Sequence, residues 1–268
     1  MTPKYILVSD LTVIKQRFHS RLLPGFTEIP KSYSISSGDN SYVIVDPNSI
    51  LVLRYGMTPH YALELLNITT ARSEGMKNKA DNPGNNGSKA IFLQQEFMKP
   101  IFSQRCVVVA DAYYEWSETN QPYLVYLQNK ARPIGLAGIY DTWQNPVTKE
   151  LVKSFAVITT TANEMLQKIG VKRMPVILPP QYETNWLKSS MHLSEILRYL
   201  AKFPSEKMNA FPVSDLVKLG EVNDASLVMS IGDRLQVEET PIPTVRRSHY
   251  HKTKPVSNTP WFKMPGQD

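Results

Sequence analysis

The stretch RCVVVADAYYEW at residues 105–116 decides the fold of this chain. It is rich in valine, alanine and aromatic residues, and β-branched and aromatic side chains favour extended strands. Similar short apolar runs, bounded by Pro, Asn or Gly, follow and precede it. They occupy residues 42–46, 50–56, 123–127, 135–143 and 154–160. Strands are therefore expected to dominate the centre of the chain.

Helical spacing of apolar residues appears in fewer places. Residues 11–22, after the capping candidates Ser9 and Asp10, repeat apolar side chains every three to four positions, as do residues 91–102 and 193–203. These segments do not alternate regularly with the strands. The pattern therefore predicts an α+β fold with a mixed or antiparallel sheet rather than a doubly wound one.

The length of the chain and the distribution of its charges indicate how it is divided into domains. With 268 residues, 42% of them hydrophobic, it is long enough for one substantial core, so one domain is expected. Residues 77–89 and the segment after about residue 240 have the composition of loops. We expect a domain over residues 1–240 and a basic, Pro-rich tail over residues 241–268. The tail has five Lys or Arg against one Asp, a net +4 of the total +6, so most of the positive excess is local.

Cysteine and histidine usage exclude several kinds of site. Cys106 is the one cysteine, so the chain has no intramolecular disulfide and no C-x-x-C metal or redox site, which fits a cytoplasmic protein. In the N-terminal segment, Lys4 and Asp10 flank an apolar run that is too short for the core of a signal peptide or for a membrane-spanning helix. The histidines lack metal-ligand spacing apart from His249 and His251 in the tail. We expect no metal, no cofactor and no membrane partner.

Residues 105–116 also open an ordered series of blocks that continues with GLAGIYDTW (135–143), FAVITTTAN (155–163) and KRMPVIL (172–178). The series resembles the SOS response-associated peptidase family, whose blocks read approximately RCLIPADGFYEW, FAGLWDTW, FAIITTEAN and HDRMPVIL. LRYGMTPHYA (53–62) and TTARSEG (69–75) are similar to the family's MRWGLIPSWA and NARAET. The likeness covers about residues 1–240, and four long blocks in order are more specific than one short motif.

The resemblance implies a single compact domain with a barrel-like sheet surrounded by helices. It also implies a positively charged cleft for single-stranded DNA and reaction with the aldehyde of an opened abasic site. In the family, the cysteine after the initiator methionine supplies both an α-amine and a thiolate, which close a thiazolidine ring on that aldehyde. A glutamate and a histidine transfer the protons.

This chain departs from the family at the catalytic positions. Matching MTPKY with the family's MCGRY places Thr2 at the nucleophile and Lys4 where an arginine is usual. A threonine hydroxyl is a poor nucleophile beside a thiolate. Thr70 stands where the family has asparagine, and Gly170 or Val171 stands where it has histidine. The chain is therefore identified as a divergent member that lacks the catalytic cysteine.

Other cleft residues of the family are retained. Glu115 is expected to be the remaining carboxylate of a degenerate site that once included the Thr2 position, although it could instead be a structural partner of Arg72 or Arg173. Arginine holds phosphate oxygens with two N–H groups, and an aromatic face can stack on a base. The predicted DNA contacts are Lys4, Arg72, Arg173, Tyr55 and Thr160. Cys106, within an apolar strand, is expected to be a structural residue.

Three functions remain open at this point. The leading hypothesis is a monomer that binds single-stranded or abasic DNA without forming a covalent bond. The second is an enzyme: a crosslinking protein or abasic-site lyase that uses the N-terminal amine through a Schiff base, or a peptidase. The third is a protein-interaction role of the tail. Salt-sensitive DNA binding, borohydride trapping and deletion of the tail would distinguish the three.

Overall fold

The stretch at residues 105–116 forms two strands that belong to two different sheets. In the computed structural model, which describes residues 3–85 and 89–238, β7 (Arg105–Ala110) and β8 (Ala112–Trp116) are separated by Asp111. The buried carboxylate of Asp111 accepts hydrogen bonds from the backbone N–H groups of Val8 and Ser9, each at 2.7 Å. This buried acceptor fixes the corner at which the chain leaves one sheet for the other.

Five strands close into a barrel. Their order is β11–β10–β7–β4–β5, and β5 pairs in parallel with β11 to complete the circle. The bounds are β4 (Asn40–Asp46), β5 (Ser49–Tyr55), β10 (Ile134–Gln144) and β11 (Leu151–Thr161). Shorter strands extend the barrel at its margins: β2 (Arg21–Leu22), β6 (Thr70–Arg72), β12 (Arg173–Pro175) and β13 (Ile177–Leu178).

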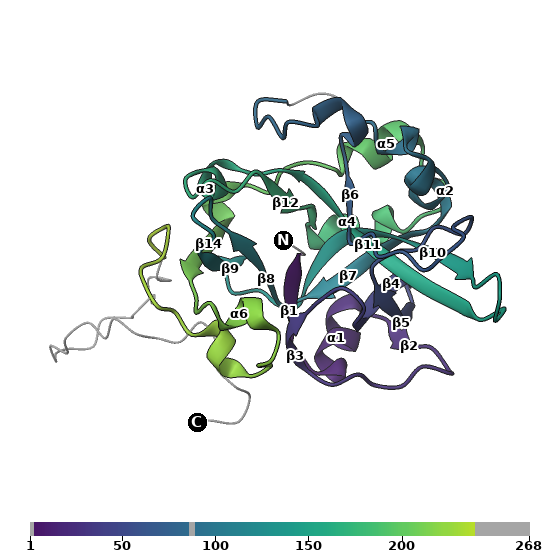
Figure 1. Ribbon diagram of the computed structural model, residues 1–268, viewed down its shortest axis with the longest axis horizontal. Coiled ribbons are helices and arrows are strands. Elements are labelled where there is room, and N and C mark those ends of the chain that lie inside the picture. Colours follow the sequence, from purple (N-terminus) through teal and green to yellow (C-terminus); the bar gives the residue numbers. More distant parts are fainter. Residues whose placement is uncertain (1–2, 86–88, 239–268) are drawn as a thin grey trace, which may run out of the picture.

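A second, five-stranded sheet lies beside the barrel (Figure 1). Its order is β14–β9–β8–β1–β3, and every pair in it is antiparallel. The remaining bounds are β1 (Lys4–Leu7), β3 (Ser32–Ile35), β9 (Pro122–Leu127) and β14 (Met208–Pro212). Because β8 directly follows β7, the two sheets share the connection at Asp111.

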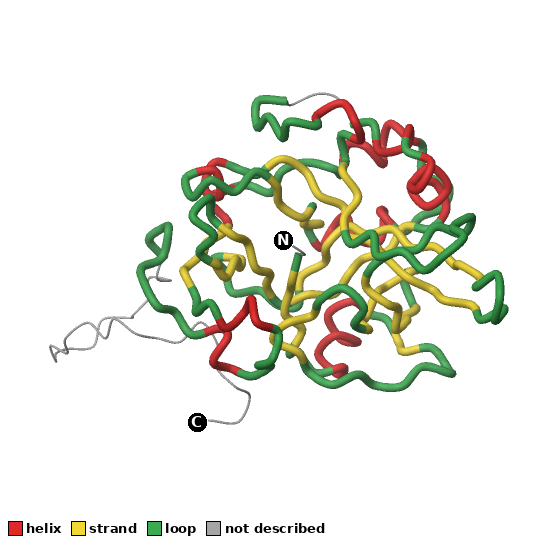
Figure 2. The backbone as a smooth tube through the Cα atoms, viewed as in Figure 1, coloured by secondary structure: helices red, strands yellow, loops and turns green. Residues whose placement is uncertain are grey.

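Short helices lie around the two sheets, as Figure 2 shows. The α-helices are α1 (Leu11–Phe18), α2 (Gln95–Ser103), α3 (Glu164–Gln167), α4 (Pro180–Trp186), α5 (Leu193–Arg198) and α6 (Leu216–Leu219). Single 3₁₀ turns are η1 (Gly75–Asn78), η2 (Ile91–Leu93), η3 (Ser205–Lys207) and η4 (Ala225–Val228). Within the described residues, no helix has both the length and the apolar character that crossing a bilayer requires.

The α+β class and the barrel-like sheet are confirmed, and all six predicted strand segments are strands. The predicted helix over residues 11–22 is too long. It ends at Phe18 because His19 adopts the left-handed conformation, with φ 52°, and Leu22 belongs to β2. The helical run at residues 91–102 is divided into η2 and α2. The tail over residues 241–268 lies outside the described residues.

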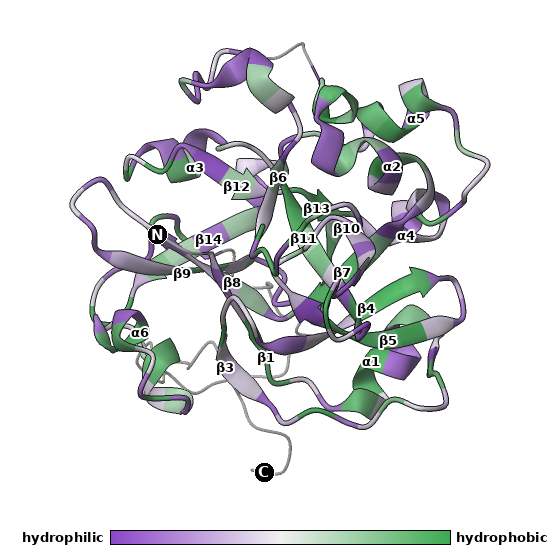
Figure 3. Ribbon diagram, turned by 45° about the vertical axis from the view of Figure 1, so that its right-hand side comes forward, coloured by the Kyte–Doolittle hydropathy of each residue, from purple (hydrophilic) through white to green (hydrophobic). Residues whose placement is uncertain are grey.

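The interior of the barrel is apolar, and its strands are mostly green in the hydropathy colouring of Figure 3. Cys106, Val108, Leu136 and Phe155 are among the buried side chains of this core. A smaller cluster packs on the second sheet around Tyr114. The barrel is therefore a filled core, and its strands are placed to hold functional side chains at their ends.

Gly138 gives a test of this packing. A Cβ atom at Gly138 would lie 2.7 Å from Cγ2 of Val108 and 2.9 Å from Sγ of Cys106, both inside the barrel. We expect Gly138→Ala to lower the free energy of unfolding by about 1–3 kcal/mol, because overpacking a rigid core forces neighbours to move. Urea denaturation measures the change. Gly84→Ala, at an exposed turn, is the matched control, and equal midpoints for the two variants would contradict the packing.

Candidate functional site

A cavity of about 370 Å³ lies where the second sheet meets β6, β11 and β12. We call it the Glu115 cavity. It brings together segments that are far apart in the sequence, since β1, β5, β8 and β12 all contribute to its wall. The lining residues that carry polar groups are Lys4, Tyr5, Tyr55, Thr69, Thr70, Tyr113, Tyr114, Glu115, Thr159 and Arg173.

Glu115 supplies the carboxyl group of this cavity. Burial raises its pKa from 4.5 to about 8, and the positive charge of Arg173 only partly opposes the shift. This carboxyl group is partly exposed and makes no hydrogen bond with another described residue, whereas the hydroxyl of Tyr113, which also lines the cavity, is buried and has no partner. Because buried polar groups are almost always paired, unpaired ones at a cavity indicate a ligand site. At neutral pH Glu115 is mainly protonated and can donate a hydrogen bond.

Glu74, rather than Glu115, makes the salt bridge with Arg173 that was the alternative role considered for Glu115. Arg173 donates from Nη2 to Oε2 of Glu74 at 2.9 Å, and Glu74 is 1% exposed. Lys89 and Thr160 contact the other carboxylate oxygen, at 3.2 and 3.0 Å, and Ser73 donates to it at 2.8 Å. Burial acts to raise the pKa of Glu74, but Arg173, Lys89 and Ser73 outweigh it and lower the pKa to about 2. Glu74 is therefore ionised and fully paired.

Asp81 ties the two predicted DNA-binding arginines together. Arg72 donates to its two carboxylate oxygens at 2.6 and 3.1 Å, and Arg173 donates to one of them at 2.8 Å. Both guanidinium groups are thus already engaged by carboxylates. Asp81 lies in the segment that was expected to be a loop, and its left-handed φ of 55° is typical of such a turn.

The other predicted DNA contacts lie in different surroundings. Lys4 lines the cavity, but its ammonium donates to the backbone carbonyl of Val217 at 2.7 Å, and burial lowers its pKa. Thr160 is fully buried in the Glu74 network. Tyr55 is also fully buried, and its ring stacks on Phe155 with centroids 5.2 Å apart. This face of Tyr55 is therefore occupied by the core.

The positions matched with lost catalytic groups are only partly brought together. Thr2 lies outside the described residues. Thr70 is in β6, opposite Val157, and lines the Glu115 cavity. Gly170 is in the turn after α3 with φ +79°, where a Cβ would lie 2.7 Å from Cβ of Glu118. Neither Gly170 nor the buried Val171 is among the described residues that line the cavity.

Cys106 cannot replace the missing nucleophile. Its side chain is fully buried in the barrel, and burial raises the pKa of its thiol. A thiol in this environment remains protonated and is out of reach of a ligand in the Glu115 cavity. The prediction of a structural role agrees with this position. No cluster of three or more His, Cys, Asp or Glu side chains among residues 3–85 and 89–238 is arranged to hold a metal ion.

The sequence that carries Glu115, Arg173 and the threonines of β11 was compared with known protein families, and one family matches it. The family model described as SOS response associated peptidase (SRAP) matches residues 1–219. The chain belongs to the SRAP family. The abasic site processing protein YoqW of Bacillus subtilis is 28% identical over 241 residues, covering 86% of this SRAP chain and 100% of YoqW. HMCES of Gallus gallus, also an abasic site processing protein, is 26% identical; the match covers 74% of this chain and 63% of HMCES.

Solved structures show the same fold. A crystal structure of a protein from Bacteroides thetaiotaomicron superimposes with a TM-score of 0.73 at 24% identity, covering 85% of this SRAP chain and 98% of that chain. A phage-related protein from Bordetella bronchiseptica gives a TM-score of 0.56 at 20% identity over 80% of this chain and 94% of its own. These similarities concern the fold alone.

Sequence reasoning missed two members of the ion-pair network beside the Glu115 cavity, Asp81 and Lys89. Both lie in or beside an Asn- and Gly-rich segment, where polar residues ordinarily indicate a solvated loop. Lys89 nevertheless reaches Thr160, 71 positions later, and Asp81 reaches Arg173, 92 positions later. No local sequence pattern indicates contacts between residues so far apart, so the sequence alone did not reveal these two pairs.

Proposed function

We propose that this SRAP-family chain acts in the DNA damage response by binding single-stranded DNA at abasic sites in the Glu115 cavity, without a covalent bond. The observation that carries the proposal is the position of the Glu115 carboxyl group, which lines the cavity and makes no hydrogen bond with another described residue; burial raises its pKa. The names of relatives such as YoqW and HMCES, abasic site processing proteins, support abasic DNA as the ligand.

The electrostatics of the cavity favour a DNA strand. With Glu115 protonated, the charged groups of the lining are Lys4 and Arg173, and the charge of Arg173 is partly neutralised by Glu74 and Asp81 behind the wall. Phosphates are attracted to such a wall, most strongly at low salt. An opened abasic sugar lacks a base and presents an aldehyde and hydroxyl groups, which are acceptors for a protonated carboxyl group. Glu115 therefore suits the sugar, and the cations suit its flanking phosphates.

The absence of a suitable thiol supports the non-covalent part of the proposal. The family's thiazolidine needs sulfur and an amine on one residue, and Thr2 occupies that position. Cys106, the one cysteine of the sequence, is buried in the barrel. A hemiaminal or oxazolidine with threonine would revert readily, so the complex is held by hydrogen bonds and charge.

The direct test compares oligonucleotides with and without an abasic site. Fluorescence anisotropy at 50 mM salt is expected to show binding that weakens by about tenfold or more at 200 mM salt, as expected for several phosphate contacts. Denaturing electrophoresis of the same mixtures is expected to show no shifted band. No anisotropy change at low salt would refute DNA binding, and a shifted band stable to denaturation would refute the non-covalent mechanism.

Treatment with borohydride distinguishes non-covalent binding from a reaction of the N-terminal amine with the abasic site. Borohydride reduces a Schiff base to a stable amine, so a trapped adduct with abasic DNA that disappears after N-terminal acetylation would identify a lyase-type enzyme. We expect no trapped adduct above the level given by an oligonucleotide whose abasic sugar has already been reduced. This pre-reduced oligonucleotide should bind without loss of affinity if no covalent step contributes.

A further inference from the structure

A second cavity, of about 550 Å³, lies next to the Glu74 network. Lys89 and Thr160 line it, whereas Arg173 and Thr159 line the Glu115 cavity. The two spaces thus share one ion-pair cluster, in which Lys89 and Arg173 both hold Glu74. We call this second space the basic pocket.

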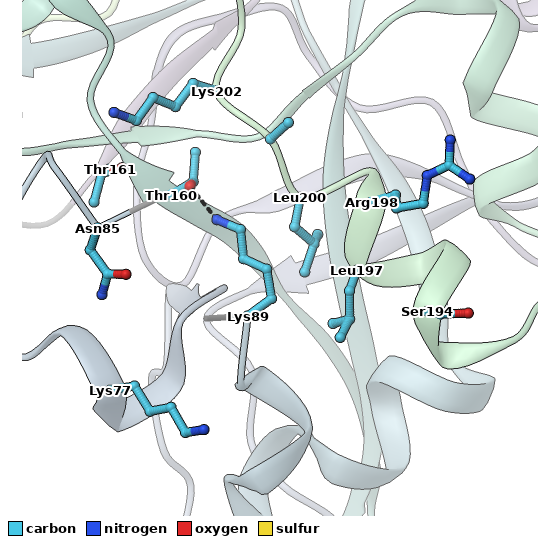
Figure 4. A pocket seen from close by; sticks show the side chains of 11 residues that line it. Lys77, Asn85, Lys89, Thr160, Thr161, Ser194, Leu197, Arg198, Leu200 and Lys202 are labelled. Atoms are coloured by element: carbon cyan, nitrogen blue, oxygen red, sulfur yellow. Dashed lines mark hydrogen bonds between the residues drawn. The ribbon is translucent and has the colours of Figure 1, made fainter. Parts of the chain in front are cut away.

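The basic pocket is ringed by cations. Among the described residues, Lys77, Lys89, Arg198 and Lys202 line it and no Asp or Glu does. Figure 4 shows that they come from two sides: Lys77 and Lys89 from the segment that follows β6, and Arg198 and Lys202 from the end of α5 and beyond. Such a concentration of one charge sign in a concave site attracts anions.

The four cations differ in how far they are already used. Lys89 is held by Glu74 and Thr160, and Lys202 donates to the carbonyl of Pro83 at 2.8 Å. Lys77 and Arg198 are exposed, and neither makes an ion pair or side-chain hydrogen bond with another described residue. The ammonium group of Lys77 and the guanidinium group of Arg198 are therefore free to bind a ligand at this pocket.

The surroundings strengthen the attraction. Burial lowers the pKa of Lys89; the carboxylate of Glu74 opposes this, and the charges of Arg173 and Lys202 lower it further. Like charges therefore act on one another across the pocket, and an anion between them would relieve the repulsion. Leu197 and Leu200 line the same space and reduce the screening by water.

We propose that the basic pocket binds a phosphate group. Resting on the proposed function for its source, this phosphate belongs to the backbone of the strand whose abasic site lies in the Glu115 cavity. Thr159 lines the Glu115 cavity, and Thr161 lines the basic pocket. The two residues are two positions apart on β11, so the walls of the two spaces are about 7 Å apart along this β-strand. A single strand of a few nucleotides spans that distance.

The test removes the two free cations. Lys77→Gln/Arg198→Gln is compared with Lys15→Gln/Lys153→Gln, which removes the same charge from exposed positions outside the pocket. At 50 mM salt the first variant is expected to bind an abasic single strand about tenfold more weakly than the second. Its dependence of log K on log salt is expected to be shallower by about 0.7, the contribution of one single-strand phosphate contact. Matching urea denaturation midpoints show that both variants are folded.

Inorganic pyrophosphate, followed by isothermal titration calorimetry at low salt, identifies the source of the phosphate. Loss of both DNA and pyrophosphate affinity in the pocket variant alone supports the inference. Loss of pyrophosphate affinity alone keeps a phosphate site but overturns the DNA backbone as its source. Equal behaviour of the two variants with both ligands overturns the pocket while leaving the proposed function intact. Pyrophosphate binding by a protein that binds no DNA keeps the pocket and refutes the proposed function, and binding of neither ligand refutes both.

Discussion

Glu74→Gln is expected to lower the free energy of unfolding at pH 7 by about 2–4 kcal/mol. The carboxylate of Glu74 is 1% exposed and accepts from Arg173, Lys89 and Thr160. Removing its charge leaves Lys89 without a carboxylate partner and Arg173 with Asp81 alone, and breaking a largely buried ion pair on one side is strongly destabilising. Urea denaturation of the two proteins measures the difference.

The pH dependence of the same variant gives an independent check. The pKa of Glu74 is about 2 in the folded protein and 4.5 ordinarily, so its contribution to stability is complete above pH 4.5 and is lost as pH falls toward 2. The gap between wild type and Glu74→Gln should therefore narrow below pH 4. Glu206→Gln removes the same charge from an exposed position and should change stability by less than about 0.5 kcal/mol. An equally small effect at Glu74 would contradict the network.

Glu115→Gln is expected to have the opposite effect and the opposite pH dependence. The pKa of Glu115 is about 8 in the folded protein against 4.5 ordinarily. Folding therefore favours the protonated form, and the wild type loses stability as pH rises from 4.5 to 8. The variant cannot ionise. At pH 9 it should be more stable than wild type by about 2 kcal/mol, a value reduced for the partial exposure of this residue, and at pH 5 the two should be nearly equal.

DNA affinity provides the second readout for Glu115→Gln. Ionised Glu115 would repel phosphates, so wild-type affinity for an abasic strand should fall by about tenfold between pH 6.5 and 9.5 beyond any fall seen in the variant. The amide of glutamine keeps a hydrogen-bond donor at the same place, so the variant should still bind. A wild type and variant that respond identically to pH would show that Glu115 does not meet the ligand.

Much of the fold could be predicted because local patterns and tertiary contacts agree in it. The strands at residues 42–46, 50–56 and 135–143 are rich in side chains that favour extended backbone, and the barrel buries them. The predicted helix failed where a single residue decided its end: His19 takes the left-handed conformation, and the chain then enters β2 instead of continuing to Leu22 as a helix. Element boundaries depend on such local conformations, which a pattern of apolar spacing does not contain.

Some residues of the candidate site were predictable from the sequence, but their pairings were not. Arg72, Arg173 and Glu115 were identified through the resemblance, and Arg173 and Glu115 line one cavity. The ion pair considered as the alternative role of Glu115 belongs to Glu74, and both arginines hold Asp81. Arg173 and Glu74 are 99 positions apart, and their contact follows from the pairing of β11 with both β6 and β12. The alternation of apolar and polar residues predicts which face of a strand is buried, but it does not predict which strand lies beside it.

The sequence by itself determined the strand-rich α+β class and the SRAP resemblance. These depend on the order and type of residues alone. Only the tertiary structure decided that Glu74 is ionised and Glu115 protonated at neutral pH, with pKa values of about 2 and 8. The two carboxyl groups are the same chemical group. Their difference arises from the hydrogen-bond donors and cations that the fold brings beside Glu74 and does not bring to the same extent beside Glu115.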